Sequence, residues 1–223
     1  MKYLFAIVLL AGFFFTPAFA QDVNNPSVII DLIEIPAEEF NIVLRDTPII
    51  LLDDTHGISW QVTIDNNLLY ANPNGDAVLR IYNQDTSGTE FVEVGMGSQP
   101  DNKLWVAVKT PKEGYIVIFR DLDRGWFPEA KLIISYTDRA GLTVNNGARI
   151  VVTNLDIDVF AINSYSVHGM EGSTDPPVVN SGIMIVEFLS GDPAENIFAL
   201  YPFFLAIGLF AIVGALIFTK KRS

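Results

Sequence analysis

Short apolar stretches rich in β-branched and aromatic residues recur along most of the chain, separated by Gly, Pro, Asn and Asp at close spacing. This pattern is typical of short β-strands joined by turns, and no helical period of useful length appears before residue 197. Pro36-Ala37-Glu38-Glu39 hints at a single helical turn. We expect about a dozen strands, over 28–35, 40–44, 49–52, 59–64, 77–82, 91–94, 104–109, 115–120, 131–136, 142–144, 149–162 and 183–189.

Turn signals between these stretches favour antiparallel pairing. Asn74-Gly75 and Asn146-Gly147 supply the positive φ angles of tight hairpin turns, and residues 110–114 separate two strong strands. Many short strands at near-regular intervals predict one all-β domain over 21–189, an antiparallel β-sandwich that is jelly-roll-like or immunoglobulin-like. The irregular stretch 171–182 is expected to be a loop of this domain, although a linker is the alternative.

The hydrophobic pattern changes at the C-terminal end. Residues 197–219 form an uninterrupted apolar run, followed by Lys220, Lys221 and Arg222. Such a run reaches roughly 34 Å as a helix and can cross a hydrocarbon core of about 30 Å. We therefore expect one C-terminal transmembrane helix, a short tether over 190–196 and a basic cytoplasmic tail over 220–223.

The first twenty residues predict a cleaved signal peptide. Met1-Lys2 is positively charged, residues 3–15 are apolar, and Ala18-Phe19-Ala20 is a small-x-small cleavage site. Together with the basic tail, this predicts a single-pass protein of the cell membrane whose N-terminal domain is extracytoplasmic and whose C-terminus is cytoplasmic.

Small residues in the apolar run indicate a possible helix contact. Gly208, Ala211 and Ala215 share one helix face and would allow close packing against a second membrane helix. Gly and Ala are also common in membrane spans without any such contact.

Charge and composition narrow the partners. The residues between the two flanks hold ten Lys and Arg and all 26 Asp and Glu, a net charge of −16. A surface this acidic repels phosphate backbones, so nucleic acid is not expected as a partner. The exported domain has no cysteine and no open glycosylation sequon, which suits a prokaryotic envelope.

Motifs that carry chemistry are mostly absent. The chain has only His56 and His168, no H-E-x-x-H, no nucleophile elbow, no phosphate loop and no dinucleotide fingerprint. We therefore expect no enzyme and no obligatory cofactor.

Two groups of residues are candidates for binding. In a continuous strand over 149–162, Asn154, Asp156 and Asp158 would share one face and could hold Ca²⁺ or a sugar, or be an ordinary solvent face. Trp126 and Phe127 lie on an expected loop, where they could stack on a sugar or contact a partner, or fold back onto the core. The polar stretch 53–57, with two carboxylates and His56, is a weaker metal candidate.

Three functions follow in order of preference. The first is a non-enzymatic interaction or accessory module, in a membrane complex or the cell envelope. The second is a calcium-dependent glycan-binding module that uses the Asn154, Asp156 and Asp158 face and the Trp126 loop. The third is a hydrolase that works through two carboxylates, for which the sequence selects no pair.

Overall fold

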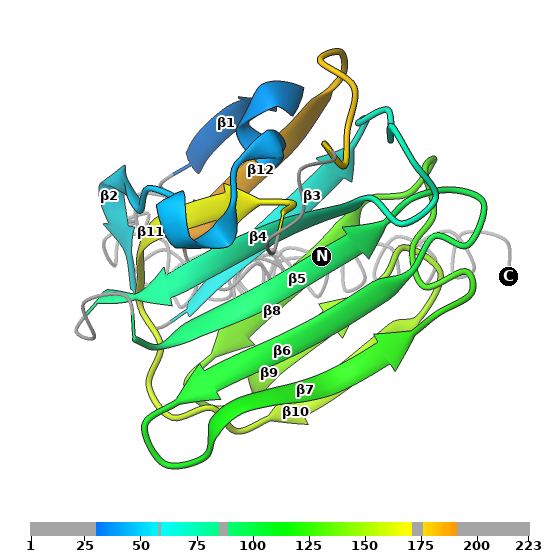
Figure 1. Cartoon of the computed structure of the whole chain (residues 1–223). Coiled ribbons are helices and arrows are strands. Elements are labelled where there is room, and N and C mark those ends of the chain that lie inside the picture. Colours follow the sequence, from blue (N-terminus) through cyan, green and yellow to red (C-terminus); the bar gives the residue numbers. More distant parts are fainter. Residues whose placement is uncertain (1–29, 58, 85–88, 171–175, 191–223) are drawn as a thin grey trace, which may run out of the picture.

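The chain folds into two six-stranded antiparallel sheets that pack against each other (Figure 1). The computed structural model describes residues 30–57, 59–84, 89–170 and 176–190. The first sheet has the order β1 (Ile30–Pro36), β12 (Ile183–Ser190), β3 (Ser59–Asn66), β8 (Leu132–Thr137), β9 (Gly141–Asn145), β10 (Ile150–Leu155). The second has the order β2 (Ile50–His56), β11 (Ile162–His168), β4 (Asp76–Asn83), β5 (Phe91–Gly97), β6 (Leu104–Thr110), β7 (Gly114–Asp121). This confirms the predicted antiparallel sandwich.

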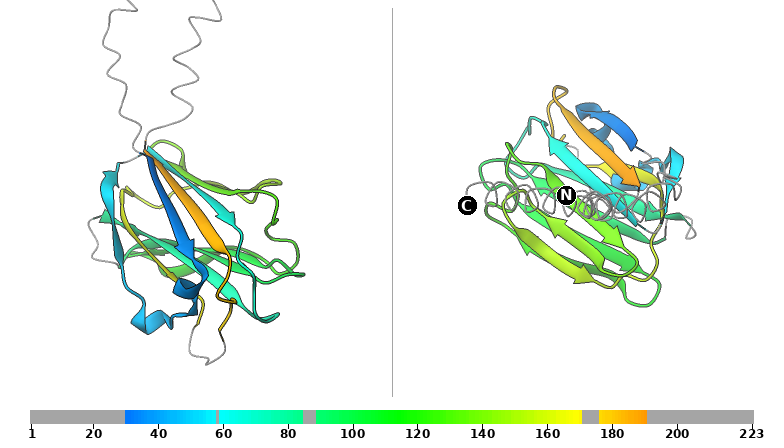
Figure 2. Two further views of the ribbon diagram at one scale, coloured as in Figure 1. Left: turned by 90° about the horizontal axis from the view of Figure 1, so that it is seen from above. Right: turned by 180° about the vertical axis from the view of Figure 1, so that it is seen from behind.

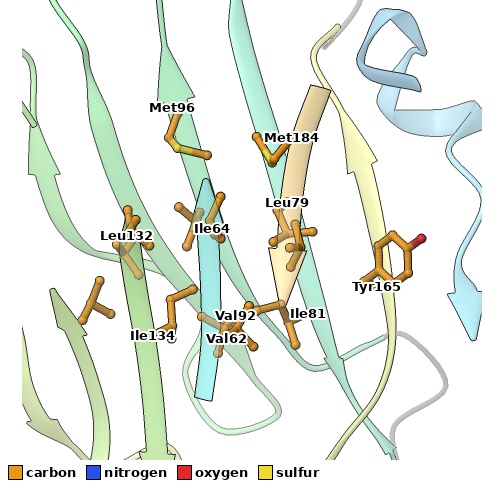
Figure 3. Close-up of a cluster of buried hydrophobic side chains, with 14 of the residues drawn as sticks. Val62, Ile64, Leu79, Ile81, Val92, Met96, Leu132, Ile134, Tyr165 and Met184 are labelled. Atoms are coloured by element: carbon orange, nitrogen blue, oxygen red, sulfur yellow. The ribbon is translucent and has the colours of Figure 1, made fainter. Parts of the chain in front are cut away.

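The core lies between the sheets and explains the apolar alternation along the strands. Facing side chains from β3, β8 and β12 meet side chains from β4, β5 and β11, as the labelled residues of Figure 3 show. Trp60 and Phe188 on the first sheet and Leu79 and Ile81 on the second are at most 1% exposed. Because the chain has no cysteine, burial of this apolar surface supplies the main stabilisation of the domain.

Two strand predictions are wrong. Residues 40–44 are not a strand: the chain forms the 3₁₀ helices η1 (Ala37–Asn41) and η2 (Leu44–Asp46), and Phe40 is fully buried. The predicted strand 149–162 ends at Leu155 as β10, and β11 begins only at Ile162. Between them the chain crosses from the first sheet to the second.

The first and last described strands are neighbours, so the described domain starts and finishes at one end. Ile30 pairs with Leu189, and Ser190 pairs with Trp60. We call this the terminal end (Figure 2, left). At the opposite end, the far end, Met184 pairs with Asn66, and Tyr70 donates a hydrogen bond to the Met96 carbonyl.

Several sequence predictions concern residues outside the described ranges. They are the signal peptide 1–20, the tether after Ser190, the apolar run 197–219 with Gly208, Ala211 and Ala215, and the tail 220–223. Among the residues that the structure does describe, no helix has the length and apolar character needed to span a membrane.

Candidate binding site on the outer face of the second sheet

Alternate residues of β11, β4, β5, β6 and β7 point away from the core, onto a surface that we call the outer face. Strand register sets which of them are neighbours. Arg80 lies opposite Glu93, and Gly95 lies opposite Trp105. Trp105 in turn pairs with Arg120, so charged and aromatic residues from four strands are brought together.

Glu93 is the centre of a hydrogen-bond network on this face. Tyr115 Oη donates to Glu93 Oε1 (2.7 Å), Trp105 Nε1 donates to the same oxygen (3.0 Å), and Arg80 Nε donates to Oε2 (2.7 Å). Burial by itself raises the pKa of Glu93, but these hydrogen bonds and the Arg80 charge outweigh it and hold the pKa below its ordinary value. The carboxylate therefore stays ionised and fixes the side chains around it.

The position of Trp105 depends on the missing side chain of Gly95. A Cβ atom on Gly95 would overlap the six-membered part of the Trp105 indole. The ring therefore lies across the neighbouring strand, where its Nε1 reaches Glu93. A glycine opposite an aromatic residue is a known way to accommodate a large ring on a sheet surface.

A hollow of about 460 Å³ lies over β6 and β7 on the outer face. Its lining combines aromatic and aliphatic side chains with charged ones: Asp76, Lys103, Leu104, Trp105, Tyr115, Val117, Arg120, Asp121 and Leu122. Tyr115 is 49% exposed, although its hydroxyl is bound to Glu93. The hollow thus presents two aromatic rings whose polar tips are already fixed.

On the side of Arg80 toward β11, the residues of the outer face are buried, and we call this the closed part of the outer face. Ser166 and Tyr82 share a hydrogen bond of 2.8 Å between their hydroxyls, and both are buried. His168 is 3% exposed, and its Nδ1 has no hydrogen-bond partner among the described residues. Burial and the nearby Arg80 charge lower the pKa of His168 to about 4, with Glu93 acting weakly in the opposite direction. This histidine is neutral at neutral pH.

The residues predicted to bind calcium lie around a different hollow, near the terminal end. Asn154, Asp156 and Asp158 line a space of about 500 Å³, but not as one regular strand face, because Asn154 and Asp158 have positive φ angles of 50° and 58°. Lys112 Nζ contacts both carboxylate oxygens of Asp158, at 3.0 and 2.9 Å. In the part of the chain that is described, no three His, Cys, Asp or Glu side chains are grouped to hold a metal ion. Calcium binding here stays a prediction.

The two predicted contact aromatics differ in their surroundings. Trp126 is 3% exposed and donates from Nε1 to the Gly97 carbonyl (2.9 Å), so it caps the core and offers no ring face to a ligand. Phe127 is half-buried beside Pro100 and Pro128, and partner contact through it stays a prediction.

The weaker metal candidate, the polar stretch 53–57, lies mostly within a strand. Asp53 to His56 belong to β2, and the His56 ring is fully buried with Nε2 at 2.7 Å from Asp31 Oδ2 on β1. His56 therefore ties the two sheets together near the terminal end.

The sequence contains a signal for Trp105 and Tyr115 that the motif search did not use. Both strands around the 110–114 turn are predicted, and period-two alternation places Trp105, Ala107 and Lys109 on one face. Pairing across the hairpin adds Tyr115 to that face. Arg80 and Glu93 lie on the consecutive strands β4 and β5, but their pairing depends on a register that no local motif gives, and His168 comes from the distant strand β11.

Comparison with known proteins gives similarity of structure only. No protein-family model and no curated protein sequence matches the chain. Similar solved structures include carbohydrate-binding module CBM66 from Bacillus subtilis (TM-score 0.40, 12% identity, 65% of this chain and 80% of that one). Lactose- and MES-liganded congerin II (0.38, 11%, 56% and 93%) and Schwanniomyces occidentalis beta-fructofuranosidase with fructosyl-erythritol (0.46, 10%, 74% and 34%) are others. Similarities this low do not indicate which ligand, if any, this chain binds.

Proposed function

We propose that this domain is a non-enzymatic carbohydrate-binding module whose site is the hollow over β6 and β7. The observation that carries the proposal is the pair of rings of Trp105 and Tyr115, which line the hollow while both polar tips are held by one buried carboxylate oxygen. A sugar ring has apolar C–H faces that pack on aromatic rings, and hydroxyls that need hydrogen-bond partners. Asp76, Lys103, Arg120 and Asp121 supply polar groups around the rings.

Rigidity strengthens the proposal. Binding sites gain affinity when their side chains need not be ordered as the ligand arrives. Trp105 is fixed by Gly95 beneath it and by Glu93 at its nitrogen, and Tyr115 is fixed by Glu93 at its hydroxyl. A sugar that enters the hollow therefore meets aromatic surface that is already in place.

The lowered pKa of Glu93 makes it unsuitable as the general acid of a glycosidase. A glycosidase needs a carboxylic acid whose pKa is raised so that it can protonate the leaving oxygen. Glu93 has a lowered pKa and accepts three hydrogen bonds, so it is unsuited to this role. The proposal accordingly assigns Glu93 to positioning.

We also propose that the module is held on the extracytoplasmic side of a membrane. If the apolar run 197–219 is an anchor, the chain leaves the domain at Ser190, so the terminal end faces the bilayer. The rim of the hollow formed by Asp76, Leu104 and Asp121 lies toward the far end, which would then face outward.

Binding to a glycan array tests the proposal. We expect Trp105→Ala and Tyr115→Ala each to weaken binding of the recognised glycan by at least tenfold, with an unchanged far-UV spectrum. Phe127→Ala is the matched control, because it removes a half-buried surface aromatic outside the hollow and should bind normally. Loss of binding in the Phe127 variant alone would move the site to that loop. Shortened glycans recovered after incubation would contradict the non-enzymatic part.

A further inference from the structure

Basic residues are scarce in this acidic domain, and two of them line the hollow. Of ten Lys and Arg against 26 Asp and Glu, four lie on the outer face or line its hollow: Arg80, Lys103, Lys109 and Arg120. The acidic residues among them are Asp76, Glu93 and Asp121. The lining of the hollow therefore balances two cations, Lys103 and Arg120, against two carboxylates, although the domain as a whole carries −16.

The cations of the hollow differ in whether they are already neutralised. Arg80 is paired with Glu93 at 2.7 Å, and Asp121 on the rim is paired with Arg149 at 3.5 Å. Among the described residues, the Arg120 guanidinium and the Lys103 ammonium have no ion-pair or side-chain hydrogen-bond partner. Two charges that the domain leaves unpaired thus line the same space as the aromatic rings.

The chemistry of these two groups fits an anion. A guanidinium matches the two oxygens of a carboxylate or sulfate in a bidentate hydrogen bond, and an ammonium adds a point charge. Lys109 also lies on the outer face, with its Nζ 5.6 Å from the Phe91 ring centre. The net charge of −16 repels polyanions and makes non-specific ionic binding unfavourable, so binding of an acidic ligand needs unpaired cations beside a surface for its ring, and this hollow has both.

We infer that the ligand of the hollow is an acidic glycan, a sugar that carries a carboxylate or sulfate group, whose anion is bound by Arg120 and Lys103 while its ring packs on Trp105 and Tyr115. This inference rests on the proposed function and adds the chemical class of the ligand. The two sources of the anion, uronic acids and sulfated sugars, share the chemistry that the site recognises.

Titration calorimetry with matched probes tests the inference on the full chain in detergent. Hexagalacturonate and its methyl ester differ only in charge, and sulfated and unsulfated dextran oligosaccharides form the second pair. We expect at least one acidic probe to bind at least tenfold more tightly than its neutral counterpart, and raising the salt from about 0.05 M to about 0.5 M to reduce this preference. The pair of probes that shows this preference tells whether the recognised anion is a carboxylate or a sulfate.

Substitutions assign the preference to residues. Arg120→Gln and Lys103→Gln should each remove most of this preference, because glutamine keeps a hydrogen-bonding group but loses the charge that binds the anion. Arg139→Gln is the control. Arg139 lines the other hollow, beside Asn154, Asp156 and Asp158, so its replacement should leave the preference for acidic probes unchanged. Equal affinity for acidic and neutral probes, or an unchanged preference in the Arg120 and Lys103 variants, would overturn the acidic ligand and leave the proposed function intact. If no probe and no arrayed glycan binds, both are overturned.

Discussion

At the scale of single residues, the candidate site depends on Gly95. Its missing side chain lets Trp105 lie across β5, and this position brings the indole nitrogen to Glu93. Glu93 in turn fixes Tyr115 and neutralises Arg80. The geometry of the hollow thus follows from a residue that contributes no side-chain contact of its own.

Gly95→Ala tests this dependence. The added methyl group overlaps the Trp105 ring, so we expect the ring to be displaced, the domain to lose about 1–3 kcal/mol of unfolding free energy, and glycan affinity to fall. Urea unfolding and near-ultraviolet circular dichroism measure the first two effects. Gly57→Ala is the control: a Cβ there meets no atom of the described residues within 4 Å, so the change should stay within about 0.5 kcal/mol. Equal stability of both variants would show that Gly95 does not hold Trp105 in place.

At the scale of elements, the two Asn-Gly pairs show what a local motif determines. Asn146-Gly147 joins β9 to β10 as predicted, with Gly147 at a φ of 94°. Asn74-Gly75 does not join paired strands: it forms a turn before β4, and Gly75 is required because a Cβ would overlap the Pro177 carbonyl. The glycine of the dipeptide therefore provides a positive φ angle in Asn146-Gly147 and allows close backbone packing in Asn74-Gly75.

Asn146→Ala and Asn74→Ala separate these roles. Asn146 is 2% exposed, donates to the Gly125 carbonyl (2.8 Å) and accepts from the backbone N–H groups of Ala148 and Arg149. Its loss leaves buried groups unpaired, and we expect about 2–3 kcal/mol of destabilisation in urea unfolding. The exposed Asn74 side chain makes no hydrogen bond within the described ranges, so its replacement should cost less than about 0.5 kcal/mol. Comparable losses in the two variants would contradict the buried role of Asn146.

Strand existence could be predicted from the sequence wherever apolar residues alternate, and β11 shows why this fails elsewhere. Its outer positions are Ser164, Ser166 and His168, small or polar residues that are buried on the outer face. These polar side chains are buried because they make tertiary contacts such as the Ser166–Tyr82 hydrogen bond. The period of apolar residues along the strand does not predict such contacts. The strand prediction for 40–44 is wrong for the opposite reason. Its apolar residue Phe40 packs into the core from a 3₁₀ helix and not from a strand.

At the scale of the whole molecule, the outer face combines four consecutive strands, β4 to β7, with the distant strand β11. Local alternation could have joined Trp105 to Tyr115 through their hairpin, but Arg80, Glu93 and His168 become neighbours only when β11, β4 and β5 are aligned in register. A one-residue slip of any strand would turn its outer residues into the core. The fold class was therefore accessible from the sequence, whereas the network around Glu93 required the register of β4, β5, β6 and β7.

This network also makes the stability of the whole domain depend on pH. The pKa of His168 is lowered from 6.5 to about 4 by burial and by Arg80, so between these values the unfolded chain binds a proton that the folded domain does not. Stability therefore decreases as the pH falls from about 6.5 to about 4, by at most about 3 kcal/mol from this group. Glu93 acts in the same direction at lower pH, because its lowered pKa stabilises the fold above the ordinary glutamate pKa and this contribution is lost as the pH falls through the folded value.

His168→Gln isolates the first contribution. We expect the variant to lose less stability than the natural protein between pH 6.5 and about 4, because glutamine does not titrate, while the difference between the two proteins stays constant above pH 7. Urea unfolding at a series of pH values measures both. The remaining decrease below about pH 4.5, which Glu93 and other carboxylates cause, should persist in the variant. Parallel stability curves for the two proteins across the whole series would show that His168 titrates normally in the folded domain, and that the closed part of the outer face admits water.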